Sequence, residues 1–379
     1  MPAPTILWNP LRGRPPAPWA LTPSPREFHR RLPGYDPTPL VDSPALAESL
    51  GLGRVWIKDE SWRLGLPAFK MLGASWASYR MLIGMLGHEP EWSTVDELAA
   101  ALAPLKPLTL VAATDGNHGR AVARTAALLG LSAEILMPAG TAPARIEAIL
   151  WEGASVEVVD GTYDDAVAAS AALASADHLV VSDTSWPGYA EVPGWVIDGY
   201  STIFAEVDEQ LAAADAAALD AVVVQMGVGA LAAATVAHVR DPDGGGPLVI
   251  VVEPDTADCG LRSADAGHLV DVPGPHTSIM AGLNCGRASE VAWPAVAAGT
   301  DVFVAVTDAD AEEAMRDLAA VGIESGETGG SGWAGLRVLV AQGTDRLGPT
   351  STVLVINTEG PTDPEAYARI VGAAAVARP

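Results

Sequence analysis

Lysine is scarce in this sequence of 379 residues. Only Lys58, Lys70 and Lys106 are lysines, and the other cationic side chains, among 22 in total, are arginines. A reaction that needs a primary amine therefore has three side-chain candidates. Positive charge is scarce as well, because 47 acidic residues bring the net charge to −25. Nucleic-acid binding needs clustered lysine and arginine, so we expect no nucleic-acid partner.

Cysteines and long apolar runs are also nearly absent. Cys259 and Cys285 are the only cysteines, and neither belongs to a CxxC pair that would hold zinc, so we expect no metal. The two thiols are either unpaired or joined in a single bridge between loops. No apolar run is long enough to span a bilayer, and no secretory signal opens the sequence. We therefore expect a cytoplasmic protein with no membrane partner.

The remaining composition is typical of a globular protein, with 49% hydrophobic and 18% charged residues. Between residues 108 and 182, and again between 221 and 356, uninterrupted apolar segments alternate with amphipathic ones. This alternation predicts an α/β fold with parallel sheets that are buried on both faces. The stretch 254–289 is rich in glycine and proline and predicts an irregular segment.

The first alternating block looks like a small compact lobe, and Trp186, Pro187 and Gly188 mark its end. We expect residues 86–190 to form a small α/β domain that is inserted into a large domain made of 1–85 and 191–379. Residues 1–45 contain twelve prolines and predict an extended arm that lies over the surface.

A glycine-rich turn follows one of the predicted strands. Residues 225–232 read Gln-Met-Gly-Val-Gly-Ala-Leu-Ala, and a helix is predicted from Ala230. Main-chain N–H groups and the helix dipole would converge there, which suits a phosphate. The same pattern also matches a dinucleotide site, with Glu253 at the end of the next strand as the acid that binds the ribose. A purely structural turn is the third alternative.

Lys70 lies where a loop meets a helix that is predicted over residues 69–86. A lysine amine attacks an aldehyde only when it is neutral, and neutrality requires a desolvated, apolar site. Leu66, Phe69 and Met71 predict such surroundings. The alternative is a structural lysine that pairs with a carboxylate.

A third polar segment, Thr114-Asp-Gly-Asn-His-Gly119, follows the strand predicted over 108–113. Loops at the carboxyl ends of parallel strands are where α/β proteins bind ligands. Asp115 is a candidate base or partner of a cation, and Asn117 is a candidate hydrogen-bond partner of a phenolic oxygen. The structural alternative is a cluster that caps the following helix.

Together these segments resemble the tryptophan-synthase-like, or fold type II, pyridoxal-phosphate enzymes, and within them the diaminopropionate ammonia-lyase family. The motifs that carry the resemblance appear in the family's order between about residues 37 and 363. They are Ala68-Phe-Lys-Met-Leu-Gly-Ala74, Thr114-Asp-Gly-Asn-His-Gly119, Ser182-Asp-Thr-Ser-Trp-Pro-Gly-Tyr189, Ile279-Met-Ala-Gly-Leu-Asn-Cys-Gly286 and Asn357-Thr-Glu-Gly360. Relatives that act on threonine or serine usually have a small hydroxyl residue in place of Asp115. The resemblance implies a large cofactor-binding lobe, a smaller inserted parallel α/β lobe, and a homodimer.

The resemblance also implies how pyridoxal 5′-phosphate would be held. Lys70 would carry the cofactor, and Asn117 would contact its phenolic oxygen. Thr358 would face the pyridine nitrogen, where a hydroxyl does not force protonation of the ring and so favours elimination over transamination. The phosphate would bind to the main chain of Gly227, Val228, Gly229, Ala230 and Leu231.

The catalytic residues implied by the resemblance are Lys70, Asp115 and Asp183. The two aspartates would orient the β-ammonium group of a small diamino acid, since an amine leaves well only when it is protonated. Asp115 would take the α-proton from the D-enantiomer, and Lys70 from the L-enantiomer. The aminoacrylate product would hydrolyse to pyruvate and ammonia. The segment 324–332 carries extra residues relative to the family pattern, so no individual contact is assigned to it.

Three other functions compete with this one. The first is β-elimination or β-replacement on another small amino acid, such as a serine-like, threonine-like or specialised-metabolite substrate, with the same cofactor. The second is a nicotinamide-dependent dehydrogenase that uses the Gly227 turn, which leaves Lys70 and Asp115 unexplained. The third is a binding protein that keeps the fold without catalysis.

Overall fold

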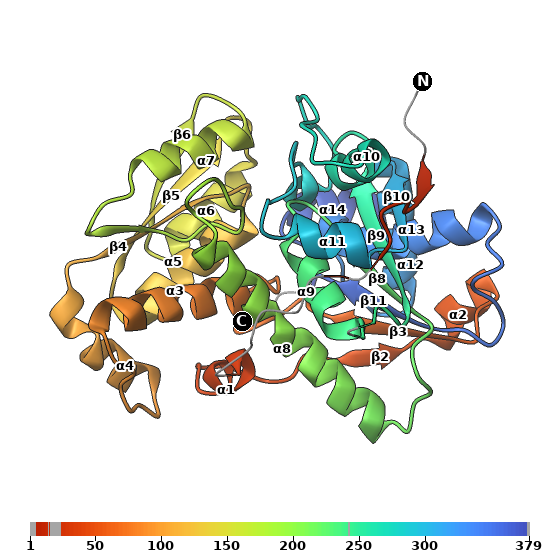
Figure 1. Ribbon diagram of the computed structural model, residues 1–379, viewed down its shortest axis with the longest axis horizontal. Helices are drawn as coiled ribbons and strands as arrows, with labels where there is room; N and C mark the ends of the chain where they lie inside the picture. Colours follow the sequence, from red (N-terminus) through yellow and green to blue (C-terminus); the bar gives the residue numbers. More distant parts are fainter. Residues whose placement is uncertain (1–4, 14, 16–23, 242, 377–379) are drawn as a thin grey trace.

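The computed structural model describes residues 5–13, 15, 24–241 and 243–376, and its strands form two sheets (Figure 1). The larger sheet is parallel in its five inner strands, with an antiparallel strand at each edge. Its order is β1 (Ile6–Trp8), β10 (Val302–Val306), β9 (Leu248–Pro254), β8 (Ala221–Gln225), β11 (Thr352–Asn357), β3 (Arg54–Asp59) and β2 (Leu40–Asp42). The smaller sheet is entirely parallel, in the order β6 (Ser155–Val159), β5 (Ser132–Pro138), β4 (Thr109–Ala113) and β7 (His178–Val180). The predicted parallel α/β fold is confirmed.

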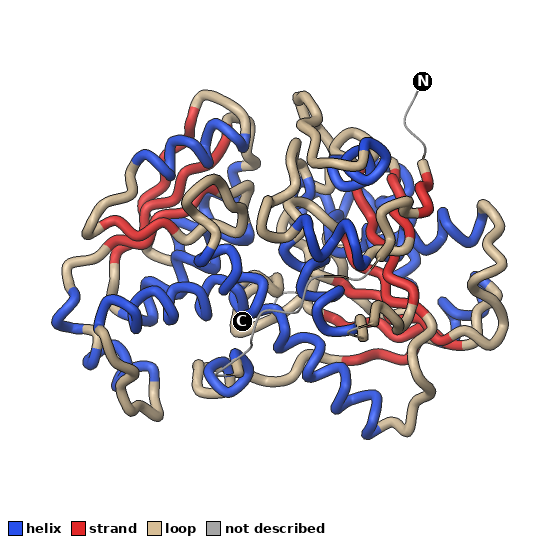
Figure 2. The backbone as a smooth tube through the Cα atoms, in the orientation of Figure 1, coloured by secondary structure: helices blue, strands red, loops and turns tan. Residues whose placement is uncertain are grey.

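Helices surround both sheets (Figure 2). They are α1 (Pro25–His29), α2 (Pro44–Leu50), α3 (Met71–Leu86), α4 (Val95–Ala101), α5 (Asn117–Leu129), α6 (Pro143–Trp151), α7 (Tyr163–Ala172), α8 (Glu191–Ala213), α9 (Ala230–Val239), α10 (Cys259–Ala266), α11 (Trp293–Gly299), α12 (Asp308–Ala320), α13 (Glu327–Ala341) and α14 (Pro364–Val371), with 3₁₀ turns η1 (Ala103–Leu105) and η2 (Ala281–Leu283). Capping boxes at Thr94, Thr162 and Thr307 start three of them, because each threonine accepts a hydrogen bond from the third helical amide. None of the helices in the described ranges has the length and hydropathy needed to cross a bilayer.

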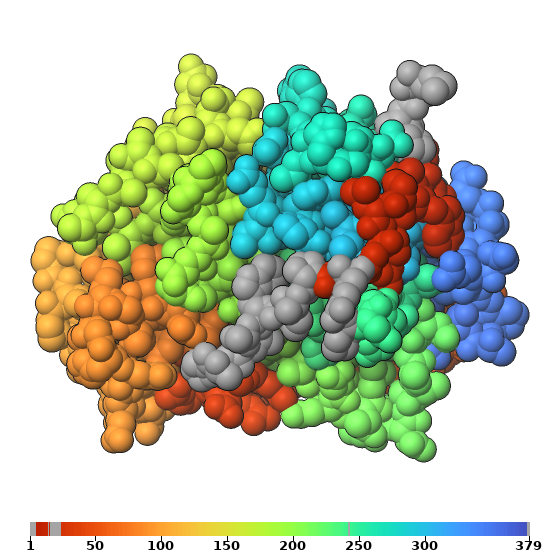
Figure 3. Space-filling view, in the orientation of Figure 1, coloured from red at the N-terminus to blue at the C-terminus, as the bar shows by residue number. Residues whose placement is uncertain are grey.

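The five inner strands of the larger sheet are buried on both faces. Because side chains alternate along a strand, Val222 and Val224 of β8 join the apolar cluster that contains α8 and α9. Val223 points the other way, into the cluster that contains α12 and α13. The first cluster also includes Leu110 and Ile135 of the smaller sheet, so one continuous core joins the two halves of the molecule. Figure 3 shows these halves in contact across one face, with yellow-green segments of one against cyan segments of the other.

Helix α3, which begins directly after Lys70, crosses α8 at very short range. A Cβ atom at Gly199 of α8 would lie 2.5 Å from the main-chain oxygen of Leu72, and one at Gly73 would lie 2.6 Å from the Tyr200 ring. Only glycine permits this approach, since a methyl group at either position would collide with atoms that are themselves packed. The crossing therefore fixes the first turn of α3 against the longest helix of the fold.

Two predictions for irregular regions are wrong in part. The described part of the proposed arm contains β1, α1 and β2 rather than an extended chain. Phe28 of α1 is buried against the rings of Trp76 and Tyr79, so aromatic packing outweighs the proline content. The segment 254–289 contains α10, whose first amides are capped by the Glu253 carboxylate.

A cluster of four charged side chains supports the loop that leads to Lys70. Lys58, Glu60, Arg63 and Glu206 are fully buried. The Arg63 guanidinium donates to both carboxylates, at 2.6 Å to Glu60 Oε1 and 2.7 Å to Glu206 Oε2. Lys58 Nζ donates to Glu206 Oε2 at 2.8 Å. The cluster ties the loop after β3 to α8, and pairs every charge it buries.

Candidate active site

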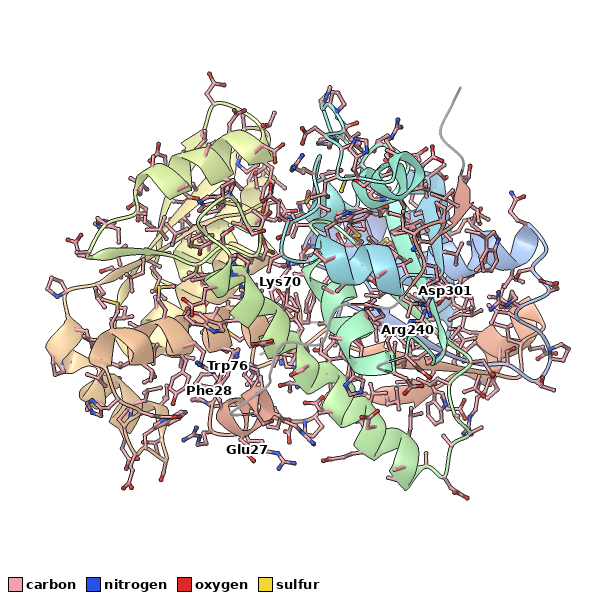
Figure 4. All side chains as sticks on the ribbon, in the orientation of Figure 1. Glu27, Phe28, Lys70, Trp76, Arg240 and Asp301 are labelled. Atoms are coloured by element: carbon pink, nitrogen blue, oxygen red, sulfur yellow. The ribbon has the colours of Figure 1, made fainter. Side chains whose placement is uncertain are left out.

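Lys70 is positioned by the pairing of two short segments. Residues 67–69 run antiparallel to 358–360, with a bridge between Ala68 and Glu359 and a 3.0 Å hydrogen bond from Gly360 N to Pro67 O. The Lys70 side chain then lies between the halves of the molecule that carry the two sheets (Figure 4). Its Nζ donates to Asp183 Oδ2 at 2.7 Å. The structure thus joins a lysine after β3 to an aspartate that follows β7.

The prediction of a neutral amine at Lys70 is wrong for this structure. Leu66, Phe69 and Met71 are buried as expected, but the amine itself faces carboxylates. Burial alone would lower the pKa of Lys70, yet Asp183, Tyr200 and Asp115 raise it above its ordinary value. Lys70 is therefore an ammonium here. Asp183 is 113 residues away in the chain, so the neighbours of Lys70 in sequence gave no sign of it.

Asp183 is the ionised partner of this pair. Burial would raise its pKa, but the nearby charges of Lys70 and His118 outweigh burial and lower the pKa to about 2. The Tyr163 hydroxyl donates to the second oxygen of Asp183 at 3.4 Å. Asp183 can therefore hold a cation as a charged carboxylate near neutral pH.

The loop after β4 carries the next two candidates. The Thr114 hydroxyl accepts a 2.9 Å hydrogen bond from Gly116 N, and α5 begins at Asn117, two residues earlier than predicted. Gly116 is the N-cap residue and no side chain caps the helix, so the capping alternative is wrong. The Asn117 amide nitrogen donates instead to Glu359. Burial raises the pKa of Asp115, and the charges of Arg145 and Lys70 oppose that shift.

The glycine turn lies between β8 and α9. Gly229 has φ +97°, a left-handed conformation that side chains disfavour, and a Cβ at Gly227 would come within 3.0 Å of Gly282 O. The turn therefore brings the first amides of α9, which have no acceptor inside the helix, to the wall of a cavity. Such a group of N–H donors fits a phosphate.

Thr358 follows the last residue of β11. Its hydroxyl oxygen accepts a 2.7 Å hydrogen bond from the side-chain nitrogen of Gln225. Gln225 also donates to the main-chain oxygens of Thr328 and Gly329, and these two acceptors fix the orientation of its amide. Because Gln225 occupies a lone pair of Thr358, the threonine proton remains available to a ligand atom. Gln225 was not predicted as a site residue, because its partner Thr358 is distant in the chain.

A cavity brings these residues together, and its empty space, including open solvent at its mouth, is about 770 Å³. Its wall includes every candidate from the sequence, namely Lys70, Asp115, Asn117, Asp183, Gly227, Val228, Gly229, Ala230, Leu231 and Thr358. It also includes residues that were not predicted as site residues, among them Tyr163, Asn284, Cys285, Thr328 and Glu359. Asn284 Oδ1 and His118 Nδ1, on two of the lining residues, are buried without a hydrogen-bond partner in the described structure. The arrangement fits a phosphorylated, aldehyde-bearing aromatic ligand: N–H donors at one end, an amine at the other, and polar side chains between them.

In segment 324–332, to which no contact was assigned from the sequence, residues 327–332 form the first turns of helix α13. Thr328 reaches the cavity wall and accepts a 3.2 Å hydrogen bond from Gly282 N. Both cysteines are free thiols. Within the described residues, no group of three or more His, Cys, Asp or Glu side chains is arranged to hold a metal ion.

A dinucleotide site is not formed. Glu253, the proposed ribose-binding acid, is fully buried and accepts hydrogen bonds from Gly260 N at 2.7 Å and Leu261 N at 2.8 Å. Both carboxylate oxygens are therefore used to cap α10. Glu253 also does not belong to the wall of the cavity that the glycine turn lines.

Comparison with known proteins agrees with this geometry. The family model described as pyridoxal-phosphate dependent enzyme matches residues 31–359. The diaminopropionate ammonia-lyase of Salmonella typhimurium is 38% identical over 368 residues, which cover 91% of this chain and 90% of that protein. The holo diaminopropionate ammonia lyase from Escherichia coli has a TM-score of 0.89 at 34% identity, over 97% of this chain and 96% of that one.

Two further structures extend the comparison. The Escherichia coli enzyme has also been solved in complex with an aminoacrylate-PLP azomethine reaction intermediate, and it matches with a TM-score of 0.86 at 34% identity over 97% of this chain and 96% of that one. The threonine deaminase of T.th. matches with a TM-score of 0.70 at 24% identity, over 91% of this chain and 98% of that one, and so shares the fold. The match over most of the sequence and the cavity built around Lys70 agree: this chain belongs to the pyridoxal-phosphate-dependent enzymes of fold type II and, within them, to the diaminopropionate ammonia-lyase family.

Proposed function

We propose that this protein eliminates ammonia from 2,3-diaminopropionate, in its D-form, its L-form or both, and yields pyruvate and a second ammonia. The observation that carries the proposal is the Lys70–Asp183 ion pair beside Asp115, in a cavity that the glycine turn also lines. A substrate with two amino groups is cationic at its β-carbon, and the two carboxylates suit that charge. The relatives with 38% identity carry the name of this activity.

The residues present fit pyridoxal 5′-phosphate. The amides of Gly227, Val228, Gly229, Ala230 and Leu231 would hold the phosphate, Asn117 would donate to the phenolic oxygen, and Lys70 would carry the aldehyde carbon. Thr358 would donate its free proton to the ring nitrogen, since Gln225 already occupies its oxygen. When bound, the cofactor supplies an electron-withdrawing ring that lowers the energy of a carbanion at Cα.

The acid–base steps belong to three side chains. Lys70 would remove the α-proton of the L-isomer with its amine in the neutral form. Asp115 would remove the α-proton of the D-isomer. Asp183 would orient the β-ammonium group, so that the amine leaves in its protonated form. The low pKa of Asp183, about 2, keeps this carboxylate charged throughout the neutral range.

Product analysis tests the activity directly. We expect purified protein with pyridoxal phosphate to release pyruvate from one or both isomers of diaminopropionate much faster than from serine or threonine. The absorbance of the bound cofactor should lie at about 410–420 nm, as for protonated imines of this aldehyde. Pyruvate release from serine or threonine at an equal or higher kcat/KM would instead favour β-elimination on another small amino acid. Loss of the β-group without pyruvate release would favour β-replacement.

The roles of Asp115 and Lys70 predict an isomer-specific variant. Asp115→Asn keeps the shape of the cavity and removes the base, so kcat/KM for D-diaminopropionate should fall by about 10²-fold or more. The L-isomer should lose far less, because Lys70 serves that face. Burial raises the pKa of Asp115. As the pH is lowered, activity on the D-isomer should therefore be lost at a higher pH than it would be with an ordinary aspartate. Equal losses on both isomers would contradict the assignment.

The proposal also includes the domain division, the number of subunits and the cellular location of the protein. We place the small domain at 86–190, within a large domain formed by 1–85 and 191–379, and expect a homodimer in the cytoplasm. Two free thiols suit a reducing compartment. Light scattering on the purified protein measures the subunit number.

A further inference from the structure

Glu359 is a buried carboxylate at the wall of the cavity, and its two oxygens accept from two different elements. Oε1 accepts from Thr328 N, at the start of α13, at 3.3 Å. Oε2 accepts from the side-chain nitrogen of Asn117, at the start of α5. The residue is only 2% exposed. One side chain thus connects the start of α5, in the half of the molecule that carries the smaller sheet, to the half that carries the larger one.

The main chain of Glu359 reaches a third element. It forms the bridge with Ala68, two residues before Lys70, and its carbonyl oxygen accepts from Gly326 N at 3.1 Å. Glu359 is therefore fixed against both the segment that carries Lys70 and the first turn of α13. A group anchored in this way can hold another side chain in one orientation.

We infer that Glu359 is a positioning residue, whose carboxylate holds the Asn117 amide with its NH₂ group as the donor inside the cofactor cavity. An asparagine amide has an acceptor at one end and two donor hydrogens at the other. An ionised carboxylate only accepts, so it selects the nitrogen end. One amide hydrogen is used by Glu359, and the second is left for the phenolic oxygen. The inference rests on the proposed function and adds a residue to it.

Protonation of Glu359 would release this constraint. Burial raises its pKa to about 7, and Arg145 of α6 acts against this shift while Glu327 of α13 adds to it. The hydrogen bonds from Thr328 and Asn117 also lower the pKa. The other titratable groups on the wall of the cavity are Lys70, Asp115, His118, Tyr163, Asp183 and Cys285. Above neutral pH the carboxylate fixes the amide; as the pH falls through about 7, the protonated acid can donate to the asparagine oxygen and allow the amide to invert.

The variant Glu359→Gln tests the role of the carboxylate, because an amide has one acceptor oxygen and a carboxylate has two. Either Thr328 N or Asn117 must lose its acceptor. We expect the absorption spectrum of the cofactor-bound wild type to titrate with a midpoint near 7, and the spectrum of Glu359→Gln to lack that transition. The dissociation constant of pyridoxal phosphate, measured by equilibrium dialysis, should rise by about tenfold at a pH where the wild-type carboxylate is ionised.

A matched control is Glu327→Gln, the same substitution at a neighbouring buried carboxylate on α13. That variant should keep the spectral transition and move its midpoint to lower pH, since the charge of Glu327 raises the pKa of Glu359. Glu359→Asp retains a carboxylate and should retain a transition, with cofactor affinity between those of wild type and Glu359→Gln. Glu359→Asp therefore tests the role of the carboxylate even if Glu359→Gln does not fold.

The possible results test the role of Glu359 separately from the proposed function. If wild type binds cofactor and releases pyruvate while Glu359→Gln keeps the wild-type transition and affinity, the role of Glu359 is overturned alone. A Glu359→Asp variant without a transition would overturn it too. A wild type that binds no pyridoxal phosphate would overturn both the proposed function and this inference.

Discussion

Replacing Lys70 by alanine is expected to lower the turnover of diaminopropionate by about 10⁴-fold or more, since the change removes both the attachment point of the cofactor and an acid–base group. Among the residues that the structure describes, Lys70 is the sole lysine on the wall of the cavity. After borohydride reduction, the wild-type chain should carry the mass of the cofactor on Lys70, and the Lys70→Ala chain should carry none. Kinetics and intact-mass measurement together test this prediction.

Two further variants define what the amine does. Lys70→Arg keeps a positive charge beside Asp183 but cannot condense with an aldehyde, so it should be nearly as inactive as Lys70→Ala. Lys106 is exposed and lies outside the cavity, so Lys106→Ala should keep wild-type turnover and labelling. Cofactor mass that persisted on the Lys70→Ala chain would show that another amine carries the cofactor.

Arg63→Met is expected to lower the free energy of unfolding by about 3–5 kcal/mol, because it leaves Glu60 and Glu206 buried without their shared partner. The cost arises from an uncompensated charge in a site that excludes water. Urea denaturation measures it as a lower midpoint with a largely unchanged slope. In the folded wild type, burial would raise the pKa of Glu206, but Arg63 and Lys58 outweigh burial and lower it to about 2.

This depressed pKa also sets the pH range of the contribution. A carboxylate with a lowered folded-state pKa stabilises the fold above its unfolded pKa, and the contribution is lost as the pH falls toward 2. Acid should therefore weaken wild type through this cluster, while Arg63→Met should already lack most of that contribution at neutral pH. The control is Arg54→Met, which breaks the partly exposed ion pair with Asp42 and should lower the urea midpoint far less than Arg63→Met does. Equal costs for both variants would contradict the role of the buried cluster.

The inner strands of the larger sheet were predictable because they are buried on both faces. Segment 221–225, for example, matches the predicted bounds, since a short apolar run between turn residues has few other solutions. The N-terminal region was not predictable from local pattern. There, β1 exists because β10 pairs with it, and α1 is held by Phe28 against the aromatic rings of Trp76 and Tyr79 on α3.

Some residues of the site were likewise predictable from local sequence, and others were not. Residues in distinctive local motifs, such as Lys70, Asn117 and Gly229, were found from the sequence and lie on one cavity wall. Gln225 and Glu359 were missed as site residues because their partners are distant in the chain: Gln225 bonds to Thr358, and Glu359 to Asn117. The charge state of Lys70 was misjudged for the same reason, since neighbours in sequence say nothing of Asp183.

The burial of Lys58 among Arg63 and Glu206 has a practical consequence for chemical modification. Amine-directed reagents, such as succinimidyl esters or fluorescent isothiocyanates, need a solvent-accessible, unprotonated nitrogen. Lys58 is 0% exposed, and Lys70 lies in the cavity beside Asp183, where we propose that it carries the cofactor; this leaves Lys106 as the one lysine side chain open to such reagents in the native fold. The protein therefore offers a nearly single-site handle for a dye or a solid support, placed after η1 and away from the cavity that holds Lys70.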